Sequence, residues 1–143
     1  MPRAMGLDVG TKTIGVAISD ELRMLAHPTC TVARSGVRKD TEVLLRLVRE
    51  REVDHVVVGL PLELDGREER PARLARQIGE ALGEAAGLPV AYVDERFSSV
   101  QAERRLLAAG LSRQRRKQVI DQEAAVILLQ GWLDHGADVE EAG

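Results

Sequence analysis

The sequence has few aromatic residues and only one cysteine. Tyr92, Phe97 and Trp132 provide the 2% aromatic content of the 143 residues, so we expect an aliphatic core. So few rings also argue against a protein that binds single-stranded nucleic acid by base stacking. Because Cys30 is alone, an internal disulfide and a cysteine-rich zinc site are excluded.

Long apolar segments are missing as well. No run approaches the roughly 20 apolar residues that a membrane helix needs, and Met1 to Met5 lack the apolar stretch of a secretory signal. We therefore expect a cytoplasmic protein that does not associate with a membrane.

An excess of positive charge is also missing, since the net charge is −3. This argues mildly against nucleic-acid binding, but the distribution of charge matters more than the sum. The stretch from Arg104 to Lys117 has six basic residues and no acidic one, whereas residues 134–143 are acidic. We expect residues 134–143 to be a flexible tail that carries part of the negative charge.

The length and composition favour one globular domain over residues 1–133, because 44% of the chain is hydrophobic and 30% is charged. Short apolar runs predict strands at Arg3 to Asp8, Ile14 to Ser19, Thr29 to Ala33, Val53 to Gly59 and Leu88 to Val93. Helical periodicity predicts helices near Val37 to Val48, Pro71 to Gly87, Ser98 to Gly110 and Asp121 to Leu133, with a polar loop at Arg113 to Lys117. This order predicts an α/β fold with a mixed five-stranded sheet, an antiparallel meander plus parallel strands, and helices on both faces.

Acidic residues occur where this fold would bring them together. Asp8 interrupts a buried strand, which is costly unless the carboxylate is paired or binds a cation, although it could instead cap the following turn. Asp94 and Glu95 end another strand and could equally be solvated or paired with Arg96. Asp121 falls on the apolar stripe of the last helix, although an N-cap is its alternative role.

Four motifs closely resemble the bacterial YqgF family, over roughly Arg3 to Leu133. They are Gly6 to Asp20 (GLDVGTKTIGVAISD), Val57 to Gly66 (VVGLPLELDG), Asp94 to Ser99 (DERFSS) and Asp121 to Ala125 (DQEAA). Members of the family are described as Holliday-junction resolvases and as nucleases that mature the 5′ end of 16S ribosomal RNA.

The resemblance implies a ribonuclease H-like fold and a metal-dependent endonuclease. Carried over by position, the catalytic and metal-binding acids are Asp8, Glu95 and Asp121, and the resemblance selects Glu95 over Asp94. Mg²⁺ is the expected ion, with Mn²⁺ as an alternative, because hard cations prefer oxygen ligands. The expected partner is nucleic acid, either precursor ribosomal RNA or branched DNA, and the protein is expected to be a monomer or a homodimer.

Basic residues near these acids are candidates for contacts with the substrate backbone. Lys12 lies in a glycine-containing turn that could bind a phosphate or form a plain hairpin, and Arg96 adjoins Glu95. Further candidates precede Asp121, where a solvated loop is the alternative; they are Arg113, Arg115, Arg116 and Lys117.

Two other classes of function compete with the nuclease. Asp8 to Thr11 also resembles the first phosphate motif of actin-like and sugar-kinase ATP-binding proteins, but those need two related domains and this chain is too short. A non-catalytic nucleic-acid-binding module would not require all three acids. The position of Asp121 on the apolar stripe favours the enzyme.

Overall fold

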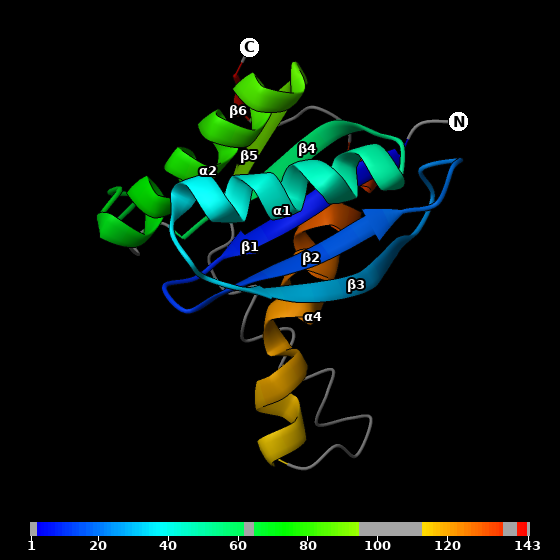
Figure 1. Ribbon diagram of the computed structural model, residues 1–143. Helices are drawn as coiled ribbons and strands as arrows, with labels where there is room; N and C mark the ends of the chain where they lie inside the picture. Colours follow the sequence, from blue (N-terminus) through cyan, green and yellow to red (C-terminus); the bar gives the residue numbers. More distant parts are fainter. Residues whose placement is uncertain (1–2, 62–64, 95–112, 136–139, 143) are drawn as a thin grey trace.

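A computed structural model describes residues 3–61, 65–94, 113–135 and 140–142, and for residues 113–121, 135 and 140–142 it describes the backbone only. Figure 1 shows a central sheet with helices packed against it. The elements in chain order are β1 (Arg3–Val9), β2 (Thr13–Ser19), β3 (Ala26–Ala33), α1 (Val37–Glu50), β4 (Val53–Leu60), α2 (Arg70–Ala86), β5 (Val90–Asp94), α4 (Arg113–His135) and β6 (Glu140–Ala142).

The sheet is mixed, and its strand order is β3-β2-β1-β4-β5-β6. β1, β2 and β3 form an antiparallel meander, and β4 and β5 join β1 in parallel. The carboxyl ends of β1, β4 and β5 therefore lie at the same edge of the sheet, where open α/β folds usually bind their ligands. The expected meander and parallel strands are both confirmed.

Helices cover both faces of this sheet, as expected. α1 and α2 bury apolar side chains such as Leu44, Ile78 and Leu82 against one face. On the opposite face, α4 packs Ala125, Leu128 and Leu129 against β1, β2 and β4. Within the described ranges no helix is both long and apolar enough to cross a membrane.

Gly6 on β1 allows α4 to approach the sheet closely. A Cβ atom at this position would lie 2.7 Å from the Cβ of Leu129, which is too close for a real contact, and 3.1 Å from the backbone oxygen of Ala125, which is unusually tight. Glycine is therefore required where the helix crosses the strand, two residues before Asp8. The backbone of α4 is thus fixed relative to this end of β1.

α4 is longer than we predicted. It begins at Arg113, so the prediction of a polar loop at Arg113 to Lys117 was wrong. Arginine, glutamine and lysine are good helix formers, and no glycine or proline interrupts the chain between Arg113 and Asp121. In Figure 1 these first turns of α4 project beyond the sheet, past β3, where a helix needs no apolar stripe.

The acidic end of the chain also differs from the tail that we expected. Asp134 and His135 belong to α4, and Glu140–Ala142 pair antiparallel with β5 as β6. Backbone groups at the free edge of a sheet can pair with almost any extended segment, so an apolar pattern is not needed there. The predicted helix from Ser98 to Gly110 lies outside the described residues.

Candidate active site

Asp8 is the penultimate residue of β1, at the carboxyl edge of the parallel strands, and its side chain is half-buried. Side chains alternate between the two faces of a strand, so Asp8 shares a face with Ala4 and Gly6. Ala4 is buried in the cluster beneath α4, and Gly6 touches that helix. Asp8 therefore lies on the face of the sheet that α4 covers.

Both neighbouring strands present a glycine beside Asp8. Gly15 of β2 is its direct partner in the antiparallel pair. On the other side, Leu7 pairs with Val58, so the next residue of β4, Gly59, is level with Asp8. Neither glycine has a side chain, so the two adjacent strands place no side chain next to the Asp8 carboxylate on this face.

The end of β5 lies level with Asp8, and Gly59 of β4 lies between them in the sheet. Gly59 pairs with Val93, which packs against the apolar cluster beneath α4, and Leu60 pairs with Asp94. Alternation then puts Asp94, which is exposed, on the face opposite to Asp8. Asp94 is therefore poorly placed to share an ion with Asp8. Glu95 and Arg96 lie outside the described residues.

Asp121 lies within α4, more than two turns after Arg113, so the alternative role of an N-cap at the start of the helix was wrong. The next residue, Gln122, donates from Nε2 to Oγ1 of Thr31 at 2.8 Å. Thr31 pairs with Gly15, which in turn pairs with Asp8. The turn of α4 that contains Asp121 is therefore anchored on the same row of the sheet as Asp8.

A second contact gives the same placement of the helix. Ala125, one turn after Asp121, is fully buried and lies against Gly6. Gly6 lies level with Ala125 and Leu129 of α4, whereas Asp8, two residues later on β1, lies on the row of the sheet that Gln122 contacts. The two elements therefore run in opposite directions, and Asp8 is nearest to the turn of α4 that contains Asp121. The structure thus brings the strand that carries Asp8 and the helical turn that carries Asp121 to one region. Among the side chains that it describes, no cluster of three potential metal ligands occurs.

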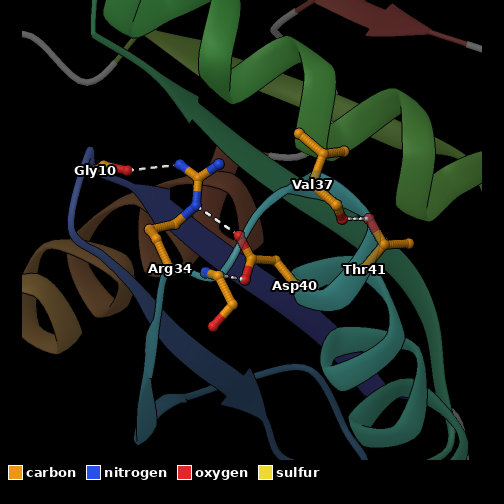
Figure 2. A network of polar contacts seen from close by, with 6 residues as sticks. Gly10, Arg34, Val37, Asp40 and Thr41 are labelled. Carbon is orange, nitrogen blue, oxygen red and sulfur yellow. Dashed lines mark hydrogen bonds and ion pairs between the residues drawn. The ribbon is translucent and has the colours of Figure 1, made fainter.

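Lys12 lies in the loop between β1 and β2, and its side chain is exposed. The loop is a tight hairpin closed by a hydrogen bond from Gly10 N to Thr13 O of 2.8 Å, as the sequence predicts. Figure 2 shows how Arg34 reaches this loop, donating from Nη1 to the backbone oxygen of Gly10 at 2.7 Å. The loop is therefore held in place from outside the hairpin.

The basic candidates Arg113, Arg115, Arg116 and Lys117 lie in the projecting first turns of α4. They precede Asp121 on the same helix, and this helix continues from them to the part of the sheet that contains Asp8. Helical spacing puts Lys117 one turn before Asp121. A regular helix fixes these positions more firmly than the loop that we expected would have done.

Sequence reasoning missed several residues that shape the site. Gly15 and Gly59 lie within two of the quoted motifs, but their position beside Asp8 could not be seen before the register of the sheet was known. Gln122 is adjacent to Asp121 and belongs to a quoted motif, but its contact with Thr31 spans 91 residues. The pairing of Arg34 with Asp40 links the end of β3 to α1 and had no sequence motif to mark it.

Two solved structures share this arrangement of strands and helices. The structure resembles the Thermus thermophilus RuvC in complex with Holliday junction substrate, with a TM-score of 0.63 at 16% identity over 99% of this chain and 100% of that one. It also resembles the fowlpox virus resolvase in a complex with Holliday junction DNA, with a TM-score of 0.57 at 10% identity over 92% of this chain and 97% of that one. At such low identities the likeness establishes the fold, which is the expected ribonuclease H-like fold.

The family follows from closer relatives. The family model RuvX, described as Holliday junction resolvase, matches residues 2–135, and the chain belongs to this family. A protein of Myxococcus xanthus is 50% identical over 132 residues, covering 92% of this chain and 87% of its own. A protein of Moorella thermoacetica is 49% identical over 132 residues, covering 92% of this chain and 94% of its own. Both relatives carry the name "Putative pre-16S rRNA nuclease", and the resemblance to the YqgF family is confirmed.

Proposed function

We propose that this protein is a Mg²⁺-dependent endonuclease that hydrolyses phosphodiester bonds in precursor 16S ribosomal RNA. The observation that carries the proposal is the common placement of Asp8 and the Asp121 turn of α4, anchored by the contact of Gln122 with Thr31. The names of the relatives from M. xanthus and M. thermoacetica favour precursor ribosomal RNA as the substrate.

The chemistry of the donor set fits a hard divalent cation. Asp8 supplies a half-buried carboxylate with glycines on both adjacent strands, and Asp121 and Glu95 would supply the other carboxylates. Val93, two residues before Glu95, lies on the face of the sheet that Asp8 shares. Oxygen ligands of this kind suit Mg²⁺ and also accommodate Mn²⁺. When bound, such ions activate the attacking water and stabilise the leaving oxygen of a phosphodiester.

The basic residues would hold the substrate backbone in place. Arg113, Arg115, Arg116 and Lys117 follow one another on the part of α4 that projects from the sheet and leads towards Asp121. Lys12 is exposed in the loop that follows Asp8, and Arg96 adjoins Glu95 in the sequence. Contacts of this kind with phosphates set the register of a nucleic acid without reading its sequence.

A second candidate substrate is a four-way DNA junction, which the description of the matching family model favours. Cutting a junction requires two opposed strands to be cleaved, so this activity would need a homodimer with two-fold symmetry. Cleavage of ribosomal RNA is possible for a monomer. A monomer in solution would therefore argue against the DNA junction as the substrate, whereas a homodimer is compatible with both candidates.

Parallel cleavage assays test the proposal. The protein would be incubated with precursor 16S ribosomal RNA and with a four-way DNA junction, each in Mg²⁺, in Mn²⁺ and with a chelator. We expect RNA cleavage that requires the metal. In the Asp8→Asn variant the rate should fall by more than about 100-fold, since even residues that only orient a metal ligand are worth roughly 10- to 100-fold.

Asp94→Asn is the matched control, because it removes a carboxylate from the same edge of the sheet but from the opposite face. It should cleave within about threefold of the parent protein, since it removes none of the proposed ligands. Equal rates for the parent protein and Asp8→Asn would reject the metal site. Binding without any cleavage, in either metal and on either substrate, would support a non-catalytic module instead.

A binding assay tests the role of the projecting part of α4. Replacing Arg115 and Arg116 by alanine should reduce the slope of log affinity against log salt by up to about 2, or roughly 0.9 for each lost phosphate contact. The control variant replaces Arg46 and Arg49, which are exposed on α1 on the opposite face of the sheet. An unchanged slope in the Arg115/Arg116 variant would remove this part of α4 from the substrate interface.

A further inference from the structure

A buried ion pair lies behind the loop that follows Asp8. Arg34, which directly follows β3, approaches Asp40 of α1 with a distance of 2.7 Å between Nε and Oδ2 (Figure 2). Their side chains are only 12% and 1% exposed. Moving two charges out of water is costly, so a buried pair is weak evidence of added stability and invites another explanation.

The pair connects three segments of the chain. Arg34 donates from Nη1 to the backbone oxygen of Gly10 at 2.7 Å, and its backbone N–H donates to the backbone oxygen of Lys12 at 2.9 Å. The second carboxylate oxygen of Asp40 accepts from the backbone N–H of Ser35 at 2.8 Å. The hairpin loop, the end of β3 and the first turn of α1 are thereby fixed to one another.

These contacts hold two of the three residues between β1 and β2 by their carbonyl groups. Gly10 and Lys12 both accept hydrogen bonds from Arg34, while the side chain of Lys12 is exposed. A lysine on a free loop loses conformational entropy when it binds a phosphate, and a loop that is already fixed reduces that loss. Planar guanidinium groups suit this task, because one Arg can bridge a carboxylate and a carbonyl oxygen at once.

We propose that Arg34 and Asp40 are positioning residues that hold the Gly10–Thr13 loop so that Lys12 meets a phosphate of the substrate beside Asp8. The inference rests on the proposed function insofar as the ligand is a nucleic acid. It assigns a role to a buried pair that touches neither substrate nor metal. In this arrangement, the contribution of Lys12 to binding depends on the pair.

A double-mutant cycle in binding measures this dependence. All proteins carry Asp8→Asn, so that the RNA is not cut, and affinity for precursor 16S ribosomal RNA is measured at several salt concentrations. With the pair intact, Lys12→Ala should weaken binding about five- to tenfold near 0.1 M salt, as expected for one lost phosphate contact. With Arg34→Gln and Asp40→Asn together, the same Lys12→Ala change should alter affinity by less than about twofold. Without the pair, Lys12 is no longer held beside the phosphate, so its removal costs little.

The matched control uses the exposed ion pair of the same helix. Arg38 and Glu42 are 93% and 59% exposed and lie 3.7 Å apart, so Arg38→Gln with Glu42→Gln makes comparable chemical changes at the surface. Lys12→Ala should cost as much in this background as with the pair intact. Equal costs of Lys12→Ala in all backgrounds, or no cost in any of them, would overturn the inference.

Folding is monitored by circular dichroism and thermal unfolding, and a second variant covers the case in which the double variant does not fold. Arg34→Lys keeps a positive charge beside Asp40 but cannot reach both the carboxylate and the Gly10 oxygen as a planar fork does. It should also suppress the effect of Lys12→Ala, and full retention of that effect would contradict the inference. Because binding is measured without cleavage, an inactive parent protein would reject the proposed nuclease while leaving this result interpretable.

Discussion

Replacing Gly6 by alanine should push α4 slightly away from the sheet. This shift should impair the site although no proposed ligand is removed. The added Cβ would lie 2.7 Å from the Cβ of Leu129 and 3.1 Å from the backbone oxygen of Ala125. Neither atom is the end of a flexible side chain, so the helix itself must shift. Asp121 lies one turn before Ala125 on α4, so a shift of the helix would also displace Asp121.

The size of the effect follows from the packing. Overfilling a well-packed interior costs about 1 to 3 kcal/mol. For a domain of this size, 1 kcal/mol corresponds to roughly 3 °C in Tm, so we expect Tm to fall by about 3 to 9 °C. Activity should fall further than stability alone explains, since a displacement near 1 Å can cost about 100-fold in rate.

Thermal unfolding and single-turnover cleavage in Mg²⁺ provide the two readouts, and Gly131→Ala is the control within the same helix. Nothing lies within 4 Å of a Cβ added at Gly131, so this change should raise stability by up to about 1 kcal/mol and leave cleavage unchanged. If Gly6→Ala unfolds at the parent temperature and cleaves at the parent rate, α4 does not pack on β1 as described.

Two further predictions concern titratable groups away from the site. Backbone N–H groups of Met24 and Leu25 donate to Asp20 and lower its pKa below the ordinary 3.8, so its stabilising effect is present above that pH and is lost as pH falls through the lowered value. Asp20→Ala should therefore lower Tm at pH 7 but much less in strong acid, and a loss independent of pH would contradict this assignment. Burial raises the pKa of the Cys30 thiol, so iodoacetamide at pH 8 should alkylate it more slowly in the folded protein than in urea; equal rates would show that the thiol is not shielded.

Much of the fold could be predicted because its signals are local. The apolar runs of β1 and β4 and the periodicity of α2 lie within single segments. Gly87 ends α2 in the left-handed conformation with φ of 67°, which glycine adopts without strain. Such features depend on neighbouring residues, and the structure bears them out.

The misjudged elements lacked a local signal. The start of α4 was placed at Asp121 because the preceding residues have no apolar stripe, yet a helix that projects from the sheet does not need one. β6 is short and acidic, and its pairing with β5 uses backbone groups that side-chain patterns do not encode. In both cases the position of the segment relative to the sheet determines its secondary structure, and composition alone does not predict it.

For the candidate site, the sequence proposes the acids but does not show what positions them. Asp8 stood out because a carboxylate in a buried strand is costly. The contact between Gln122 and Thr31 and the reach of Arg34 to Gly10 join residues that are distant in the chain, so only the folded arrangement shows them. The first contact anchors α4 on β3, and the second fixes the loop that follows Asp8.

The most direct test of the central claim is a titration of Mn²⁺, followed by calorimetry, into the parent protein and into Asp8→Asn, Glu95→Gln and Asp121→Asn. If the three acids share an ion, each substitution should weaken Mn²⁺ binding by at least about tenfold. Asp94→Asn, on the opposite face of β5, should bind Mn²⁺ as the parent does. Parent-like binding in Asp8→Asn or Asp121→Asn would show that the strand and the helix do not hold a metal between them.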